Sequence, residues 1–104
     1  MMQKNEKISL SGEEAIYVVK EINLILVSLH NIGSYYMGKE KTEYERETNR
    51  FIDDWKITDR LAVLRETLAE KFDLTLGDDD MDDVERAMEG INYWSKPSDN
   101  PTIV

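Results

Sequence analysis

The sequence predicts an all-α fold, a small antiparallel bundle of about four helices followed by a flexible C-terminal tail. Three observations favour it: a long apolar segment at residues 15–29 with a capping signal before it, later segments with apolar residues at helical spacing, and short connections between them. Short connections place successive helices side by side in opposite directions. A chain of 104 residues supports one core, so we expect one helical domain at 1–94 and a tail at 95–104.

The apolar segment predicts the central helix, from Ser11 to about Tyr36. Ser11 is a suitable N-cap, and Glu14 three residues later completes the pattern of a capping box. One stripe at helical spacing contains Ala15, Val18, Val19, Ile22, Ile25, Leu26 and Leu29. Ile16, Leu24 and Val27 fall outside that stripe, which is typical of a helix buried on more than one side. The same apolar excess also suits a dimerisation face, so a homodimer is an alternative.

The central helix is not predicted to cross a membrane. A bilayer needs about 20 consecutive apolar residues, and Lys20, Glu21 and Asn23 interrupt this run. Residues 1–10 contain no apolar core of a secretion signal. The chain has no cysteine, which suits a reducing compartment. We therefore expect a cytoplasmic protein without membrane contact.

Two further helices are predicted between residues 39 and 72. The first, at 39–55, has a narrow apolar stripe that places Trp55 in the core. The second is expected at 58–72, because Thr58 is a plausible N-cap and Asp59 a favourable acid in the first turn. Its predicted buried face consists of Leu61, Leu64, Leu68 and Phe72. The sequence also permits one long kinked helix, but the signals at 58 and 59 favour two.

A fourth helix is predicted from about residue 79 to about residue 93. Its apolar stripe would be formed by Met81, Val84, Met88 and Ile91. The segment after it carries both prolines of the chain and is expected to be disordered or loosely docked.

The charge of the chain points to basic partners. Its 22 acidic and 13 basic residues give a formal net charge of −9. Such a chain is repelled by nucleic acid and by anionic membranes, so we expect no direct nucleic-acid binding. A cationic protein or a metal ion is the natural partner, although the charge also keeps a protein soluble.

Most of this charge lies in one acidic cluster at residues 73–89, with eight acids against Arg86 alone. One or two acids satisfy the dipole at a helix N-terminus, and further carboxylates repel one another. Five aspartates within residues 78–83 therefore favour a binding function directed at Lys and Arg of a partner. Two aromatic residues that follow are candidate interface anchors. The predicted partner-binding residues are Asp78, Asp79, Asp80, Asp82, Asp83, Glu85, Tyr93 and Trp94.

Metal binding is an alternative use of the acids, although we expect neither a metal nor a cofactor. Asp78, Asp80, Asp82 and Glu89 match ligand positions of a calcium-binding EF-hand loop, but Asp83 stands where that loop requires glycine. Elsewhere, an ExxE pattern at 40–43 and an ExxD pattern at 70–73 are formed by Glu40, Glu43, Glu70 and Asp73. This pair resembles the magnesium-binding pattern of all-α nucleoside triphosphate pyrophosphohydrolases. The resemblance implies carboxylates on facing helices and attack of metal-activated water on phosphorus.

The sequence therefore predicts a non-enzymatic acidic protein that inhibits a basic protein. The most concrete form is an immunity protein that neutralises a cationic nuclease toxin, by analogy of class with the small, acidic, helical colicin-type immunity proteins. A nucleic-acid mimic of the anti-defence type, similar in role to anti-CRISPR proteins, is one alternative. A helical structural subunit or adaptor, with the central helix as its contact, is another.

Overall fold

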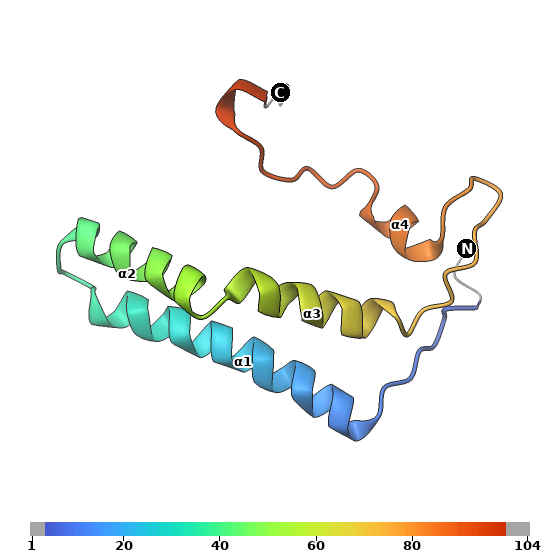
Figure 1. The fold of residues 1–104 in the computed structure, drawn as a ribbon, viewed down its shortest axis with the longest axis horizontal. Helices are drawn as coiled ribbons and strands as arrows, with labels where there is room; N and C mark the ends of the chain where they lie inside the picture. Colours follow the sequence, from blue (N-terminus) through green and yellow to red (C-terminus); the bar gives the residue numbers. More distant parts are fainter. Residues whose placement is uncertain (1–3, 100–104) are drawn as a thin grey trace.

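The computed structural model describes residues 4–99, and every regular element in that range is a helix. The α-helices are α1 (Gly12–Tyr35), α2 (Lys41–Asp54), α3 (Ile57–Ala69) and α4 (Asp83–Met88), and a short 3-10 helix, η1 (Pro97–Asp99), follows. Figure 1 shows α1 running antiparallel to α2 and α3, which follow each other end to end. The all-α prediction is confirmed, and three of the helices, α1, α2 and α3, pack against one another.

The start of α1 is the capping box that the sequence predicts. The Glu14 backbone N–H donates to Ser11 Oγ at 3.0 Å, and the Ser11 N–H donates to Glu14 Oε1 at 3.0 Å. These two bonds satisfy groups that a helix start otherwise leaves without partners. The helix continues to Tyr35, so the predicted bounds are confirmed to within a residue.

The helices α2 and α3 are separate, as predicted, but the predicted N-cap of α3 is wrong. Helix α3 begins at Ile57, and its N-cap is Lys56, which has a left-handed backbone with φ of 52°. The chain bends at that residue. The side chain of Arg60 then reaches back, and its Nε donates to the Trp55 carbonyl oxygen at 2.9 Å. This bond satisfies a carbonyl that the end of α2 leaves without an intrahelical partner.

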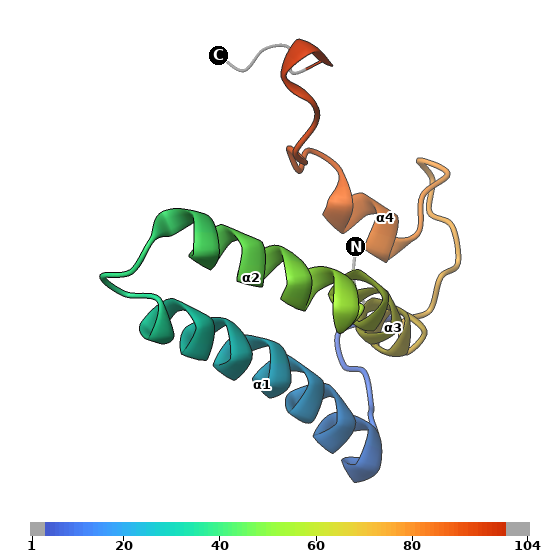
Figure 2. The ribbon, with the colours of Figure 1, turned by 60° about the vertical axis from the view of Figure 1, so that its left-hand side comes forward.

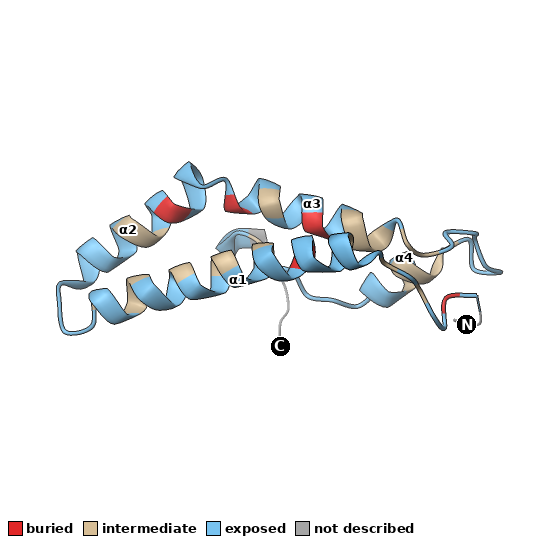
Figure 3. Cartoon of the chain, turned by 90° about the horizontal axis from the view of Figure 1, so that it is seen from below, coloured by how far each residue is buried: buried red, intermediate tan, exposed pale blue. Residues whose placement is uncertain are grey.

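The hydrophobic core is small and lies along the line where α1 meets α2 and α3. Among the described residues the buried apolar side chains are Val18, Phe51, Ile57 and Leu64. Figure 3 shows how few positions are buried. The expectation that the central helix is buried on more than one side is therefore wrong, because α1 meets neighbours along one line only. The predicted core position of Trp55 is also wrong, since the side chain contacts Phe51 but is 50% exposed.

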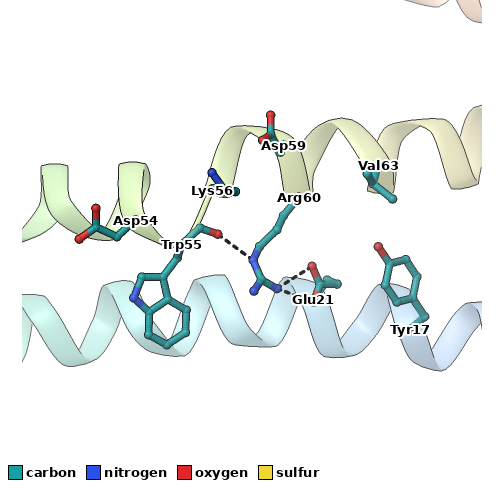
Figure 4. A pocket seen from close by; sticks show the side chains of 8 residues that line it. All are labelled: Tyr17, Glu21, Asp54, Trp55, Lys56, Asp59, Arg60 and Val63. Carbon is teal, nitrogen blue, oxygen red and sulfur yellow. Dashed lines mark hydrogen bonds and ion pairs between the residues drawn. The ribbon is translucent and has the colours of Figure 1, made fainter.

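Two ion pairs join α1 to α3 and to the chain just after α3. Arg60 Nη1 donates to both carboxylate oxygens of Glu21, at 3.0 and 2.9 Å, and Lys71 pairs with Glu14. Figure 4 shows the Arg60–Glu21 pair inside an open groove, below the Trp55 carbonyl that Arg60 also binds. Since Arg60 contacts both Glu21 of α1 and the end of α2, this one guanidinium joins all three packed helices.

Helix α4 is much shorter than the predicted helix at 79–93. A second capping box starts it late: Asp82 Oδ1 accepts from the Glu85 N–H at 2.8 Å, and Glu85 Oε1 accepts from the Asp82 N–H at 3.0 Å. The chain before it turns at Asp80, with φ of 60°, and the chain after it turns at Gly90, with φ of 87°. Ile91 therefore lies outside the helix, and α4 does not pack as a fourth member of the bundle.

The predicted flexible tail at 95–104 lies partly outside the described residues. Its described part contains η1, and its flexibility stays a prediction.

Helix α1 is long and apolar enough to cross a membrane, judged by length and composition alone. A stretch of 18 residues within it has a mean hydropathy of 1.3, and 6% of that stretch is buried. A core helix of a soluble protein can satisfy the same criterion. The expectation of no membrane contact therefore stays a prediction.

The left-handed residue between α2 and α3 predicts an unusual response to glycine. A side chain in this conformation is strained, and glycine is not. We expect Lys56→Gly to raise the free energy of unfolding by about 1 kcal/mol. The matched control, Lys20→Gly in the interior of α1, should lower it by about 1 kcal/mol. Urea unfolding followed by circular dichroism measures both; equal losses would show that Lys56 does not need this conformation.

Candidate protein-binding surface on the acidic arm

The predicted site residues lie on a segment that projects from the packed helices. We call residues 73–94 the acidic arm; it follows α3 and includes α4. Figures 1 and 2 both show α4 and the chain after it standing apart from α1 and α2. The arm must therefore be organised by interactions of its own.

Asn5 fastens the base of the arm to the N-terminal segment. Asn5 is only 5% exposed, and both the nitrogen and the oxygen of its side-chain amide make hydrogen bonds. Asn5 Nδ2 donates to the Asp73 carbonyl oxygen at 3.0 Å and to Asp83 Oδ2 at 2.7 Å, while Asn5 Oδ1 accepts from the Asp73 N–H at 2.7 Å. One amide thus joins the start of the arm to the start of α4, 10 residues later.

Arg86 organises the interior of the arm. Its Nε and Nη2 donate to the two carboxylate oxygens of Asp79, at 2.9 and 2.7 Å. Nη1 donates to Asp83 at 2.5 Å, and Nη2 also donates to the Met81 carbonyl oxygen at 3.0 Å. A side chain at Gly77 would disturb this arrangement, because its Cβ would lie 2.6 Å from Arg86 Nη2. Glycine at 77 therefore leaves room for the Arg86 guanidinium, which would otherwise have to shift.

These contacts lower the pKa of three carboxyl groups of the arm, those of Asp73, Asp79 and Asp83. The Arg86 guanidinium lowers the pKa of Asp79 to about 2, and the two carboxylates raise the pKa of Arg86 in turn. The pKa of Asp83 is lowered mainly by the hydrogen bond from Asn5 and to a smaller extent by the hydrogen bond from Arg86. The Thr75 hydroxyl and N–H, which both donate to Asp73, lower the pKa of that carboxyl. The arm therefore stays negatively charged throughout the physiological pH range.

The predicted site residues divide into two groups. Four of the acids have local structural partners: Asp79 and Asp83 bind Arg86, and Asp82 and Glu85 form the capping box. The other two, Asp78 and Asp80, are exposed, and their side chains make no hydrogen bond or ion pair among the described residues. The aromatic residues lie in the extended chain after α4, with Tyr93 68% and Trp94 84% exposed. The structure thus assigns part of the acidic cluster to folding and leaves the rest facing solvent.

Three residues that organise the arm were not predicted. Arg86 could have been found, because it is the lone base among eight acids. Asn5 gave no signal, since its partners are 68 and 78 residues away in the sequence. Gly77 could not have been found from the sequence, because its role depends on where Arg86 lies.

The carboxylates of the pyrophosphohydrolase pattern do not come together within one chain. Glu40 and Glu43 lie at the start of α2, whereas Glu70 and Asp73 lie at and beyond the end of α3. Because these helices follow each other end to end, their outer ends are separated by some 40 Å at about 1.5 Å per residue. Between residues 4 and 99, no group of three or more His, Asp or Glu side chains is placed to hold a metal ion, and this covers the EF-hand pattern as well.

Carboxylates and exposed aromatic side chains are the chemical features that the arm presents to solvent. Carboxylates attract Lys and Arg, and an exposed Trp or Tyr supplies a large apolar contact area with a polar tip. Comparisons of the chain with protein-family models, with curated proteins and with solved structures find no match.

The Arg86 contacts predict a measurable change in the acid titration of Asp79. In Arg86→Gln the pKa of Asp79 should rise from about 2 toward its ordinary value of 3.8. Because this pKa is lowered in the folded state, the contribution of the pair to stability is present above 3.8 and is lost as the pH falls through about 2. Side-chain NMR titration measures the shift. Arg65→Gln, on an exposed part of α3, should leave Asp79 unchanged; an unchanged pKa in Arg86→Gln would refute the assignment.

Proposed function

We propose that this chain is a non-enzymatic binding protein whose acidic arm binds a basic protein. The observation that carries the proposal is the exposure of Trp94 (84%) and Tyr93 (68%) directly beyond the anionic helix α4. Solvent-exposed Trp and Tyr next to charged groups are typical of the anchors that dominate binding energy at interfaces. The neighbouring acids then select for a cationic partner.

The exposed acids whose side chains have no partner within the chain support a cationic partner. Arg86 is saturated by Asp79 and Asp83, so it does not neutralise the outer carboxylates. Asp78, Asp80 and Glu89 are exposed and are available to Lys and Arg of another protein. Attraction between opposite charges also speeds encounter, which suits an inhibitor that must reach its target quickly.

The most concrete form of the proposal is an immunity protein for a cationic nuclease. In that role the exposed carboxylates of Asp78, Asp80 and Glu89 pair with the Lys and Arg that the nuclease uses for nucleic-acid phosphate, and Trp94 or Tyr93 supplies the desolvated anchor. A nucleic-acid mimic that blocks a DNA- or RNA-binding protein would use the same surface. The identity of the bound partner separates the two.

Capture of the partner tests the proposal directly. The tagged full chain, exposed to a lysate of its source organism and eluted with stepwise salt, should retain a basic protein that moderate salt releases, because contacts between exposed charges are screened there. A partner with an acidic or neutral surface would contradict the proposal.

Variants of the arm then locate the contact. Trp94→Ala should weaken binding of the captured protein by roughly tenfold or more, as expected for an anchor residue. The exposed aromatic Tyr35 on α1 gives the control, and Tyr35→Ala should leave the affinity unchanged.

Removal of the free charges should change the association rate most. The triple variant Asp78→Asn, Asp80→Asn, Glu89→Gln leaves both capping-box acids and the Arg86 pairs intact. We expect slower association and a weaker dependence on salt, measured by surface plasmon resonance. The control removes three exposed acids outside the arm: Glu40→Gln, Asp53→Asn and Glu66→Gln. Equal effects of the two triple variants would show that net charge, and not the arm, determines binding.

A further inference from the structure

The three packed helices form a single layer with two unlike sides. One side carries the open groove of Figure 4, lined by charged and aromatic side chains that include Tyr17, Glu21, Asp54 and Arg60. The other side can be located from helical geometry, because residues two positions apart point about 200° apart around a helix.

This geometry places apolar side chains together on the side opposite the groove. Val19 is two positions from Tyr17 on α1, Ile52 is two positions from Asp54 on α2, and Leu61 is two positions from both Asp59 and Val63 on α3. Further residues of α1 at helical spacing continue the surface. We call it the apolar face: Val19, Ile22, Leu26, Leu29, Ile52 and Leu61, each between 39% and 63% exposed.

The part of this face on α1 is symmetric in a way that suits contact with a second copy. Apolar or small residues recur at alternating spacings of four and three, which is the pattern of a helix–helix seam. The seam consists of Ala15, Val19, Ile22, Leu26, Leu29 and Gly33. The spacing of these residues, though not their identity, is the same in both directions about residue 24. An antiparallel copy would therefore place Ala15 opposite Gly33, Val19 opposite Leu29, and Ile22 opposite Leu26.

Charge favours the same contact. A chain with a net charge of −9 repels its own copies across most of its surface. The seam contains no charged residue, since the acids and the lysine of α1 (Glu13, Glu14, Lys20 and Glu21) all lie off it. Asn23 flanks the centre of the seam, where the amides of two copies can donate to and accept from each other.

Gly33 provides a separate observation. Glycine is unfavourable inside a helix relative to alanine, yet a Cβ at Gly33 would meet no atom within 4 Å in this chain. Nothing within the protomer therefore requires glycine there. Close approach of a second α1, with Ala15 opposite, would require a residue of this size.

The shape and area of the protomer agree with a missing second layer. Its radius of gyration is 18.2 Å, larger than the value of about 13 Å for a compact chain of this length, because the acidic arm projects and the three helices form one layer. Helical domains are built from two packed layers around one core. A face as long as the 24-residue α1 and two helices wide covers roughly 700 Å². A stable interface buries about 800 Å² per partner.

From these observations we infer that the chain forms a two-fold symmetric homodimer, in which the apolar faces pack together and α1 runs antiparallel to α1 of the second copy. The two layers then make a four-helix cross-section. A lipid surface fits the face less well, because the Glu21–Arg60 pair holds α1 in the layer and charged α2 and α3 accompany it. The inference does not rest on the proposed function, since the acidic arm lies outside the face.

A charge placed on the seam tests the dimer. Analytical ultracentrifugation of the full chain at micromolar concentration should show a dimer. Leu26→Asp should raise the dissociation constant at least a hundredfold, because it places two carboxylates in the apolar contact. Val27→Asp is the matched control: Val27 is the next residue, 44% exposed and off the seam, and its variant should remain a dimer. A monomeric native chain, or equal effects of both variants, would overturn the inference.

Cross-linking tests the antiparallel register without altering an apolar residue of the seam. The chain has no cysteine, so Asn23→Cys introduces a unique thiol beside the proposed axis. A short bis-maleimide should link two Asn23→Cys chains efficiently. It should not link two Ile16→Cys chains, whose thiols would lie some 24 Å apart along the helices at about 1.5 Å per residue. Equal linking of both variants would indicate parallel helices and overturn the arrangement.

Gly33→Leu adds a test that the protomer should tolerate. Because space around Gly33 is open in one chain, helicity should be kept while the dissociation constant rises at least tenfold. An unchanged constant would show that Gly33 does not meet a second copy. If the native chain is monomeric and instead binds phosphatidylcholine vesicles in a flotation assay, α1 contacts a membrane and the dimer is refuted.

Discussion

The structure depends on the single line along which α1 meets α2 and α3. A helix in a one-layer arrangement buries only residues that point at its neighbours. The buried apolar side chains here are Val18 on α1, Phe51 on α2, and Ile57 and Leu64 on α3. Ion pairs of Glu21 with Arg60 and of Glu14 with Lys71 fix the separation and direction of the helices. The apolar side chains of α1 that do not point at α2 or α3 are left on one side or the other of the layer.

This constraint explains why the two sides of the layer differ. On the groove side, Arg60 forms hydrogen bonds with the Glu21 carboxylate and with the backbone carbonyl of Trp55. On the opposite side, aliphatic side chains remain about half exposed. Exposed apolar surface on this scale is typical of an interface, since isolated soluble proteins rarely keep it uncovered. The proposed dimer would give the chain the second layer that its own helices do not supply.

The acidic arm is built on a different principle, in which hydrogen bonds and ion pairs replace a core. Asn5 and Arg86 together bind the backbone or side chains of Asp73, Asp79 and Asp83. Because α4 adds little to the packing of the three helices, changes at its outer acids can alter binding with little effect on the fold. This separation makes the proposed function and the proposed dimer independently testable.

Local signals in the sequence were reliable where the responsible interactions are local. The capping box of Ser11 and Glu14 and the amphipathic patterns gave the helical class and the bounds of α1, because each needs residues only a few positions apart. The predictions failed where a choice depended on distant partners. Thr58 resembled an N-cap, but Arg60 and the turn at Lys56 set the start of α3. The fourth helix was predicted too long, because the Asp79–Arg86 pair stabilises a turn where periodicity indicated helix.

The sequence by itself determined that the chain is helical, where its first helix begins and ends, and that its negative charge concentrates in one segment, because these properties follow from local propensity and composition. Only the tertiary structure decided which carboxylates are used for folding and which face solvent. It also decided that the most apolar helix is covered along one line only. Both outcomes depend on which segments meet in space. The spacing of apolar residues along α1 shows which of its sides are apolar, but it does not determine which segment packs against each side.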